Sequence, residues 1–289
     1  MKAAPFVYHR PRTCAELTQL LSSLENVRML AGGQSLMPML NLRVAAPDHL
    51  IDLNRVEGLG GIELRGGKLV IGTMTRQREA ELSPLVAEHC PLLIQALEHV
   101  GFQQTRNRGT VGGSIAHMDP TAELVVAAYA LDATVVLKSR DGERSMPARE
   151  FNDGYLCNKT RRGEFLSRVE FPVRAKRHGA AFEEVTRRGE TLSVVSVGAY
   201  VDLNDAGELA RAGVAISGLG PAPVCLDVSP WLGKPAQEAM TESLSWSAGE
   251  LVADDDLTIP ADYKQHLAGV LTRRAVGRAL ARVQEARHG

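Results

Sequence analysis

Residues 31–38 read Ala31-Gly32-Gly33-Gln34-Ser35-Leu36-Met37-Pro38, and residues 107–117 read Asn107-Arg108-Gly109-Thr110-Val111-Gly112-Gly113-Ser114-Ile115-Ala116-His117. Each stretch contains two adjacent glycines that are followed within one residue by a serine. Because glycine has no Cβ, its backbone N–H can come close to a ligand, and consecutive N–H groups in such turns form a nest for anions. Two facing loops of this kind could hold a diphosphate from both sides, which suits a dinucleotide cofactor better than a single phosphate.

Other familiar nucleotide and catalytic motifs are missing from the sequence. The segment Gly58-Leu59-Gly60-Gly61 comes nearest to a G-x-G-x-x-G pattern but lacks its third glycine, so a Rossmann domain is not supported. No Gly-Lys-Ser or Gly-Lys-Thr forms a Walker A loop, and no His-Glu-x-x-His occurs. For either glycine pair alone, a plain tight turn between strands is the competing interpretation.

The spacing of apolar residues predicts a mixed α+β region, then an antiparallel sheet, then helices. Thr13 lies three residues before Glu16, a capping-box spacing that predicts the start of the first helix. We expect a glycine-rich loop over 106–114 and a domain boundary near Pro172 to Gly179. The other expected strands lie at 6–8, 27–31, 49–53, 68–72, 134–138, 180–185, 193–203 and 211–217, and the other helices at 76–100 (broken or started by Pro84 and Pro91), 120–131, 236–251 and 263–287.

The composition is that of an ordinary globular protein. Of the 289 residues, 44% are hydrophobic and 23% are charged. The formal net charge of -1 argues against sequence-independent binding to nucleic acid, which needs a clustered basic field. Aromatic residues make up only 4%, so stacking platforms for nucleic-acid bases are not expected either.

The cysteines and the apolar stretches bear on cofactors and location. The four cysteines contain no Cys-x-x-Cys pair, so their spacing supports neither a zinc site nor an iron–sulfur cluster, and we expect thiols in a reducing compartment. The N-terminus lacks the continuous apolar run of a signal peptide. The most apolar stretch, Leu124 to Leu137, is shorter than the roughly 20 residues of a membrane span. We therefore expect a cytoplasmic protein with no membrane span.

At the two glycine stretches the chain resembles the FAD-binding medium subunit of molybdenum hydroxylases, as in carbon monoxide dehydrogenase and bacterial N-heteroaromatic dehydrogenases. It is also similar to the FAD domain of xanthine dehydrogenase. The first matching run extends from Ala31 to Arg43 and continues to Asn54, and the second extends from Thr105 to Leu124. A looser third match is Arg187-Arg188-Gly189, so the resemblance spans nearly the whole chain.

The resemblance implies an α+β fold of the vanillyl-alcohol-oxidase (PCMH) type. An FAD-binding domain over residues 1–175 would consist of two α+β subdomains, about 1–55 and 56–175. A C-terminal domain over residues 176–289, like that of the carbon monoxide dehydrogenase flavoprotein, would combine an antiparallel sheet with a helical bundle. The order of elements expected from the apolar pattern agrees with this arrangement.

The resemblance also implies where FAD binds. Both glycine stretches would surround the diphosphate and ribityl group, Glu123 would bind a ribose hydroxyl, and the backbone at Leu166, before a strand at 169–171, would face the adenine. His117 could hydrogen-bond the cofactor or only orient its loop, and Asp119 is expected to cap a helix rather than bind a ligand. The expected FAD-binding residues are Ala31, Gly32, Gly33, Gln34, Ser35, Leu36, Thr110, Val111, Gly112, Gly113, Ser114, His117, Glu123 and Leu166.

Four arginines near the expected site have open roles. Arg106 and Arg108 could screen the diphosphate, contact an iron–sulfur subunit or simply be exposed. The same alternatives apply to Arg187 and Arg188. No residue is expected as a general base, a nucleophile or a metal ligand, because a bound flavin would carry the redox chemistry.

The sequence departs from the family pattern at two positions. Many relatives have Gly-Asp-aromatic after the paired arginines, with the aromatic ring near the flavin, whereas this chain has Glu190-Thr191-Leu192. Leu192 would therefore replace the aromatic residue. Family members also use histidine in place of Gln34, which offers only a neutral amide.

The implied function is electron transfer. A large molybdopterin subunit would hydroxylate the substrate, and electrons would pass through the [2Fe-2S] clusters of a small subunit to FAD and then to an external acceptor, in a heterohexamer with two copies of each subunit. No catalytic residue and no metal ligand would belong to this chain. The alternatives are a standalone FAD-dependent oxidase or dehydrogenase of the same fold, and a scaffold protein that has lost FAD.

Overall fold

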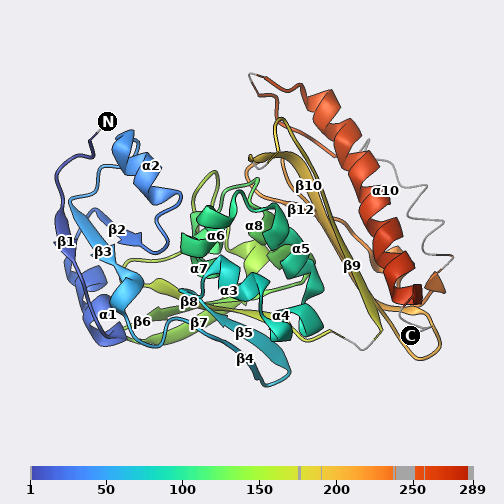
Figure 1. Ribbon diagram of the computed structural model, residues 1–289, viewed down its shortest axis with the longest axis horizontal. Helices are drawn as coiled ribbons and strands as arrows, with labels where there is room; N and C mark the ends of the chain where they lie inside the picture. The colour runs from blue at the N-terminus through green and yellow to red at the C-terminus, as the bar shows by residue number, and fades with distance from the viewer. Residues whose placement is uncertain are drawn as a thin grey trace.

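Three β-sheets follow one another along the chain and along the long axis of the molecule (Figure 1). The structure is a computed structural model that describes residues 2–174, 177–189, 191–236, 238, 251–256 and 258–285. The mixed α+β architecture with a separate antiparallel sheet and helix at the C-terminal end confirms the expected fold class.

The first layer is a parallel sheet of three strands in the order β1-β3-β2, formed by β1 (Val7–His9), β3 (His49–Asp52) and β2 (Val27–Leu30). Helix α1 (Cys14–Ser23) connects β1 to β2, and Thr13 caps it by accepting a hydrogen bond from the Glu16 N–H at 3.1 Å. Helix α2 (Leu36–Asn41) and the short helix η1 (Leu53–Arg55) complete this layer. The capping residue expected from the sequence is thus confirmed.

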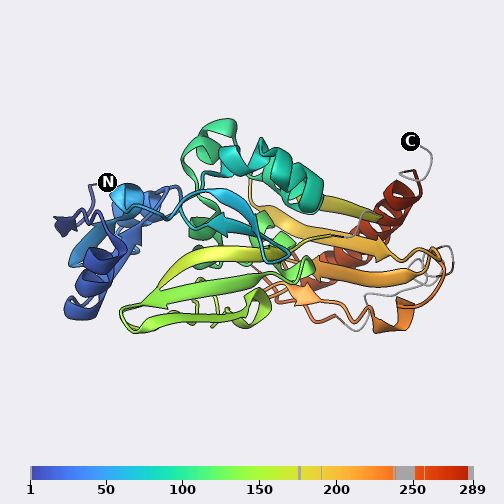
Figure 2. The same cartoon turned by 90° about the horizontal axis from the view of Figure 1, so that it is seen from below.

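The middle layer is a five-stranded antiparallel sheet in the order β4-β5-β8-β6-β7. Its strands are β4 (Ile62–Arg65), β5 (Lys68–Gly72), β6 (Thr134–Ser139), β7 (Gly142–Pro147) and β8 (Phe165–Pro172). Figure 2 shows the teal helices of this layer on one side of the yellow-green strands. The helices of this layer are α3 (Gln77–Glu81), α4 (Pro84–His89), α5 (Pro91–His99), α6 (Gln103–Arg108), α7 (Val111–His117) and α8 (Glu123–Ala130), with the short helix η2 (Ala148–Glu150) after β7.

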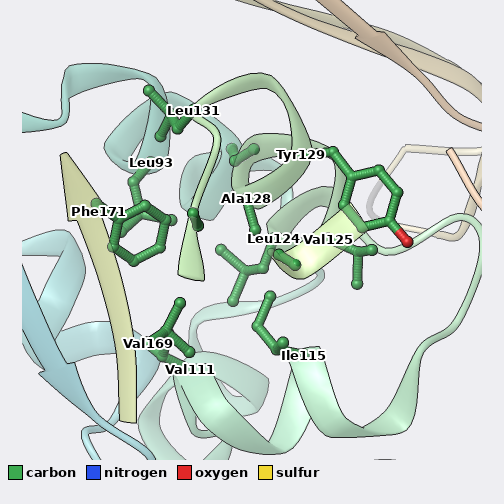
Figure 3. Close-up of a cluster of buried hydrophobic side chains, with 14 of the residues drawn as sticks. Leu93, Val111, Ile115, Leu124, Val125, Ala128, Tyr129, Leu131, Val169 and Phe171 are labelled. Carbon is green, nitrogen blue, oxygen red and sulfur yellow. The ribbon is translucent and has the colours of Figure 1, made fainter. Parts of the chain in front are cut away.

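The main hydrophobic core lies between these helices and the sheet (Figure 3). Helix α7 contributes Val111 and Ile115, and helix α8 contributes Leu124, whose side chains are all at most 1% exposed. Phe171 of β8 closes the core from the sheet side. The burial of Val111 and Ile115 fixes helix α7 in one rotational position, so its other face points away from this core.

The C-terminal layer is a four-stranded antiparallel sheet in the order β12-β11-β10-β9, covered by one long helix. Every residue of β10 is buried, because helix α10 packs on one face of the sheet and helices α5 and α8 pack against the other. A Cβ on Gly179 of β9 would lie 1.9 Å from the carbonyl oxygen of Ala279, so the strand and α10 approach closely. The elements are β9 (His178–Thr186), β10 (Ser193–Leu203), β11 (Leu209–Ile216), β12 (Val224–Cys225), η3 (Ser229–Trp231) and α10 (Ala261–Glu285).

Two local expectations from the sequence are wrong. Residues 106–114, expected as a glycine-rich loop, lie mostly in helices α6 and α7, with the turn confined to Gly109 and Thr110. Strand β4 was not expected, although its four residues, Ile62–Arg65, alternate between apolar and polar side chains. Most of the helix expected over 236–251 lies outside the described residues.

Candidate functional site

A cavity of about 1260 Å³ lies between the first and the middle layer and reaches the start of β10. Its lining includes residues 31–36 at the end of β2 and one face of helix α7. Every residue expected to bind FAD lines this cavity except Val111, whose side chain belongs to the hydrophobic core (Figure 3). The structure therefore brings together segments that are about 50 to 130 residues apart in the sequence, since Leu36, Ser114 and Leu166 all line the cavity.

The first glycine stretch presents a row of free N–H groups. The backbone bends at Gly33, which has a φ of 77°, and helix α2 begins three residues later at Leu36. The Met37 N–H donates to the Gly33 carbonyl oxygen at 3.0 Å. Within the described part of the chain, the N–H groups from Gly32 to Leu36 make no hydrogen bond. Such a run of unpartnered N–H groups beside a cavity can bind phosphate oxygens.

The second glycine stretch differs from the first, because its N–H groups are already used inside the protein. The N–H groups of Val111 and Gly112 donate to the carbonyl oxygens of Thr75 and Thr73, each at 3.0 Å. The Gly113 N–H donates to the side-chain oxygen of Thr110, which caps helix α7. The expectation that both stretches offer backbone N–H groups to a ligand is therefore wrong for residues 111–113. This stretch can offer side chains instead, such as the hydroxyl of Ser114.

The glycines bring the two stretches into contact with their surroundings. A Cβ on Gly32 would lie 2.3 Å from the carbonyl oxygen of Arg108, so the first stretch rests directly on the start of the second. A Cβ on Gly112 would lie 1.9 Å from the Thr73 hydroxyl oxygen. The missing Cβ atoms thus allow a close backbone approach within the protein, besides the approach of a ligand.

Gln77 is a site residue that the sequence analysis missed. Its side chain is 5% exposed and lines the cavity, and its Oε1 has no hydrogen-bond partner among the described residues. A buried acceptor without a partner is energetically unfavourable, so a donor from a bound molecule would stabilise it. A glutamine at the start of an ordinary helix carries no signal in the sequence. The free N–H groups, the Ser114 hydroxyl and Gln77 fit a ligand that has both a diphosphate and hydroxyl or N–H donors, as FAD has.

Glu123 lies at the buried end of the cavity. It is 7% exposed at the start of helix α8, and burial raises its pKa to about 8, with the charges of Glu184 and Asp119 adding to the effect. Nearby, His99 Nδ1 lies 3.0 Å from Glu184 Oε1, and this hydrogen bond raises the pKa of His99. This end of the cavity therefore holds a carboxyl group that is protonated at neutral pH and able to donate a hydrogen bond.

Four other residues named in the sequence analysis also line the cavity. Asp119 lines the cavity but does not cap helix α8, whose N-cap is Ala122; its Oδ1 instead accepts from Thr121 N–H at 2.9 Å. Leu166 lies within strand β8 rather than before it, and His117 lines the cavity. Leu192 lines the cavity, is 66% exposed and directly precedes Ser193, whose hydroxyl donates to the Thr121 carbonyl oxygen at 3.2 Å.

The arginines beside the second stretch do not line the cavity. The Arg106 guanidinium bonds Glu81 at 2.9 Å and the carbonyl oxygens of Val100 and Gly101, so it holds helix α6 against α3. Arg187 and Arg188 are exposed. The expected alternative that Arg106 screens a diphosphate finds no support in these contacts.

Three observations concern metals, thiols and membranes. Among the residues that the structure describes, no group of three or more His, Cys, Asp or Glu side chains could hold a metal ion. The cysteines Cys14, Cys90, Cys157 and Cys225 are free thiols. No helix in the described ranges is both long and apolar enough to cross a bilayer.

Comparison with known protein families gives two matches that together cover most of the chain. Residues 4–174 match the family described as "FAD binding domain in molybdopterin dehydrogenase". Residues 180–279 match the "CO dehydrogenase flavoprotein C-terminal domain".

Individual relatives align over nearly their whole length. The carbon monoxide dehydrogenase medium chain of Hydrogenophaga pseudoflava is 34% identical and the alignment covers 96% of this chain and 98% of that protein. The caffeine dehydrogenase subunit beta of a Pseudomonas species is 31% identical, with 98% and 97% covered. Among solved structures, quinoline 2-oxidoreductase from Pseudomonas putida 86 superimposes with a TM-score of 0.89 at 31% identity and covers 98% of this chain and 99% of that one.

A carbon monoxide dehydrogenase from Hydrogenophaga pseudoflava superimposes with a TM-score of 0.91 at 33% identity, over 98% of this chain and 99% of that chain. The fold, the free N–H groups beside the cavity and these matches agree with one another. The chain belongs to the family of FAD-binding medium subunits of molybdenum hydroxylases.

Proposed function

We propose that this chain is the electron-transferring FAD subunit of a molybdenum hydroxylase complex. The observation that carries the proposal is the run of unpartnered N–H groups from Gly32 to Leu36, which faces a cavity of about 1260 Å³. FAD, when bound, supplies the chemistry of accepting and releasing electrons. The cavity as described offers binding and positioning groups, and no catalytic residue of this chain is proposed.

Each part of the cavity would hold a different part of the cofactor. The N–H groups of residues 32–36 would bind diphosphate oxygens, assisted by the hydroxyls of Ser35 and Ser114, which both line the cavity. Gln77 Oε1 would accept a hydrogen bond from a hydroxyl or N–H of the cofactor. Glu123 would bind a ribose hydroxyl, and its raised pKa means that it does so without placing a negative charge beside the diphosphate. Thr110, Gly112, Gly113, His117 and Leu166 are proposed as the remaining contacts on the basis of their place in the lining.

We propose that the partners are a small subunit with [2Fe-2S] clusters and a large molybdopterin subunit, in a heterohexamer with two copies of each. Electrons would reach FAD from the iron–sulfur clusters and leave to an external acceptor. The carbon monoxide dehydrogenase medium chain, the caffeine dehydrogenase subunit beta and a chain of quinoline 2-oxidoreductase all align over nearly the whole of this chain, although their names give different substrates. This similarity supports a division of labour in which another subunit selects the substrate.

The division of the chain near residue 175 and a cytoplasmic location belong to the same proposal. The two family matches, over 4–174 and 180–279, support a two-domain organisation. Free thiols at all four cysteines support a reducing compartment.

The decisive experiment is gentle purification of the tagged chain from its native host, followed by a visible absorption spectrum and identification of the copurified chains. Flavin bands together with a broad iron–sulfur shoulder, with two partner chains in equal amounts, are expected. A lone yellow protein would indicate a standalone oxidase or dehydrogenase. A colourless protein that remains colourless after addition of FAD would indicate a scaffold and would overturn the proposal.

A further inference from the structure

Arg76 belongs to neither glycine stretch, but its side chain links the two through hydrogen bonds. One nitrogen of its guanidinium donates to the carbonyl oxygen of Arg108 at 2.5 Å, directly before the turn that leads into helix α7. The other nitrogen donates to Asn54 Oδ1 at 2.6 Å. The Asn54 amide in turn donates to the carbonyl oxygen of Ala31 at 3.0 Å, where the first stretch begins. A continuous chain of hydrogen bonds therefore runs from one stretch to the other.

The far end of this chain is anchored in the first sheet. Asp52, the last residue of β3, accepts hydrogen bonds from the Asn54 amide at 2.6 Å and from the Tyr8 hydroxyl at 2.5 Å. Burial alone would raise the pKa of Asp52, but these two hydrogen bonds lower the pKa, so the carboxylate is charged at neutral pH. Asn54 is thus held in one orientation, with its oxygen toward Arg76 and its nitrogen toward Ala31.

This series of hydrogen bonds passes from the first layer to the middle layer at the point where the two layers touch. Gly32 follows Ala31 and leaves no room for a Cβ, which would lie 2.3 Å from the same Arg108 carbonyl oxygen that Arg76 binds. The contact at Gly32 only prevents the stretches from coming closer. The hydrogen bonds through Asn54 and Arg76 prevent them from moving apart.

We infer that Arg76 and Asn54 form a clasp that sets the distance between the free N–H groups of the first stretch and the start of helix α7, and that they are positioning residues for the cofactor. This inference rests on the proposed function. Neither side chain of the clasp carries chemistry: Asn54 acts on the backbone at Ala31, and Arg76 acts on the backbone at Arg108.

The test compares Arg76→Ala, Asn54→Ala and the double variant in the full-length chain, with Arg78→Ala as the matched control. Arg78 lies two residues further on, in the first turn of the helix that Arg76 precedes, and pairs with Glu81 at 2.9 Å, but it touches neither stretch. FAD binding is measured by fluorescence titration and by the visible circular dichroism of the bound flavin. Each single clasp variant is expected to weaken FAD binding about 10- to 100-fold, and the double variant to add little to either, because both break the same chain. Arg76→Lys, which can keep one of the two hydrogen bonds, is expected to restore part of the affinity.

A second measurement needs no FAD. Hydrogen–deuterium exchange of the FAD-free chain reports on the Met37 N–H, bonded to Gly33, and on the Gln77 N–H, bonded to Gly109. The clasp predicts faster exchange at both N–H groups in Arg76→Ala than in Arg78→Ala, with global unfolding temperatures that match. If the wild-type chain bound no FAD, the proposed function would fail while this exchange measurement would still decide on the clasp.

Two results would overturn the inference. One is equal exchange at Met37 and Gln77 in the clasp variants and the control. The other is a lowered unfolding temperature with unchanged FAD affinity in the folded protein, which would make Arg76 a purely structural residue. If Arg76→Ala does not fold, Tyr8→Phe removes a single hydroxyl from the anchor and is expected to shift both readouts in the same direction by a smaller amount.

Discussion

Gly32 and Gly112 lie where neighbouring protein atoms leave no room for a Cβ. At Gly32 the obstacle is the backbone of the second stretch, and at Gly112 it is Thr73, the residue that follows β5. The sequence shows the two glycine pairs but predicts only one of their roles, which is to let a ligand approach the backbone. They serve contacts inside the protein as well as access for a ligand.

Gly112→Ala is expected to destabilise the protein by about 1–3 kcal/mol and to weaken FAD binding, because the added Cβ would push helix α7 away from Thr73. Gly277→Ala is the matched control, since a Cβ on Gly277 of helix α10 meets no atom within 4 Å and alanine favours helix. Thermal unfolding monitored by circular dichroism checks both variants. An unchanged or raised unfolding temperature for Gly112→Ala would contradict the packing argument.

Glu123 gives the protein a predictable pH dependence. Its pKa is raised from 4.5 to about 8 in the folded state, so the folded state binds this proton more tightly than the unfolded state does. The contribution of Glu123 to the unfolding free energy is therefore fully present below about pH 4.5 and is lost as the pH rises toward 8. Glu123→Gln is expected to lack this loss. The unfolding free energy of Glu123→Gln minus that of wild type is therefore expected to increase between pH 5 and pH 8.

Denaturant unfolding of the FAD-free chain at several pH values measures this effect. Glu88→Gln serves as the control, because the Glu88 side chain is 73% exposed. Parallel pH profiles for wild type and Glu123→Gln would show that Glu123 ionises as freely in the folded chain as in the unfolded one.

At the level of helices and strands, local signals predicted much of the fold. Thr13 caps α1, and Pro84 and Pro91 occupy the first positions of α4 and α5, as their chemistry favours. Helix α6 was missed because its polar residues, Gln103–Arg108, show no apolar periodicity. Helix α7 was missed because glycine, which has a low helix propensity, occupies its positions 112 and 113. There the Thr110 cap and the burial of Val111 outweigh that propensity.

Pairings between distant segments could not be read from the sequence. Strand β5 pairs with β8, so that Leu69 lies opposite Phe171 across about 100 residues of chain. The same limit explains why Gln77 and the Asn54–Arg76 clasp were missed, since the role of each depends on contacts with residues far away in the sequence. The glycine stretches were found because their signal is local.

The C-terminal layer is expected to contribute stability rather than cofactor affinity. Leu271 of helix α10 is 1% exposed in a core that is separate from the cavity lining. Leu271→Ala is expected to lower the unfolding free energy by about 2–5 kcal/mol, while the FAD dissociation constant of the folded protein stays within a factor of two of wild type. Val252→Ala, at a side chain that is 82% exposed, is the control. A large loss of FAD affinity in Leu271→Ala would show that the two cores are coupled.

For the molecule as a whole, the cavity is a shared surface, lined by residues from Leu21 in α1 to Leu192 before β10. A ligand that touches all of these segments stabilises them together. Added FAD is therefore expected to raise the unfolding free energy by about 2.7 kcal/mol at a concentration 100-fold above its dissociation constant. Unfolding curves at increasing FAD check this, and a separate transition that does not respond to FAD would show that part of the chain unfolds independently.

The contact of Gly32 with the Arg108 carbonyl oxygen has a consequence for the order in which the protein is made. The free N–H groups of residues 32–36 leave the ribosome early, but the backbone on which they rest comes more than 70 residues later, and β8, which joins the middle sheet together, comes later still. A nascent chain shorter than about 108 residues would thus display these N–H groups without the backbone on which they rest. Because β8 completes the middle sheet only near residue 172, cofactor uptake is expected to follow translation of most of the chain.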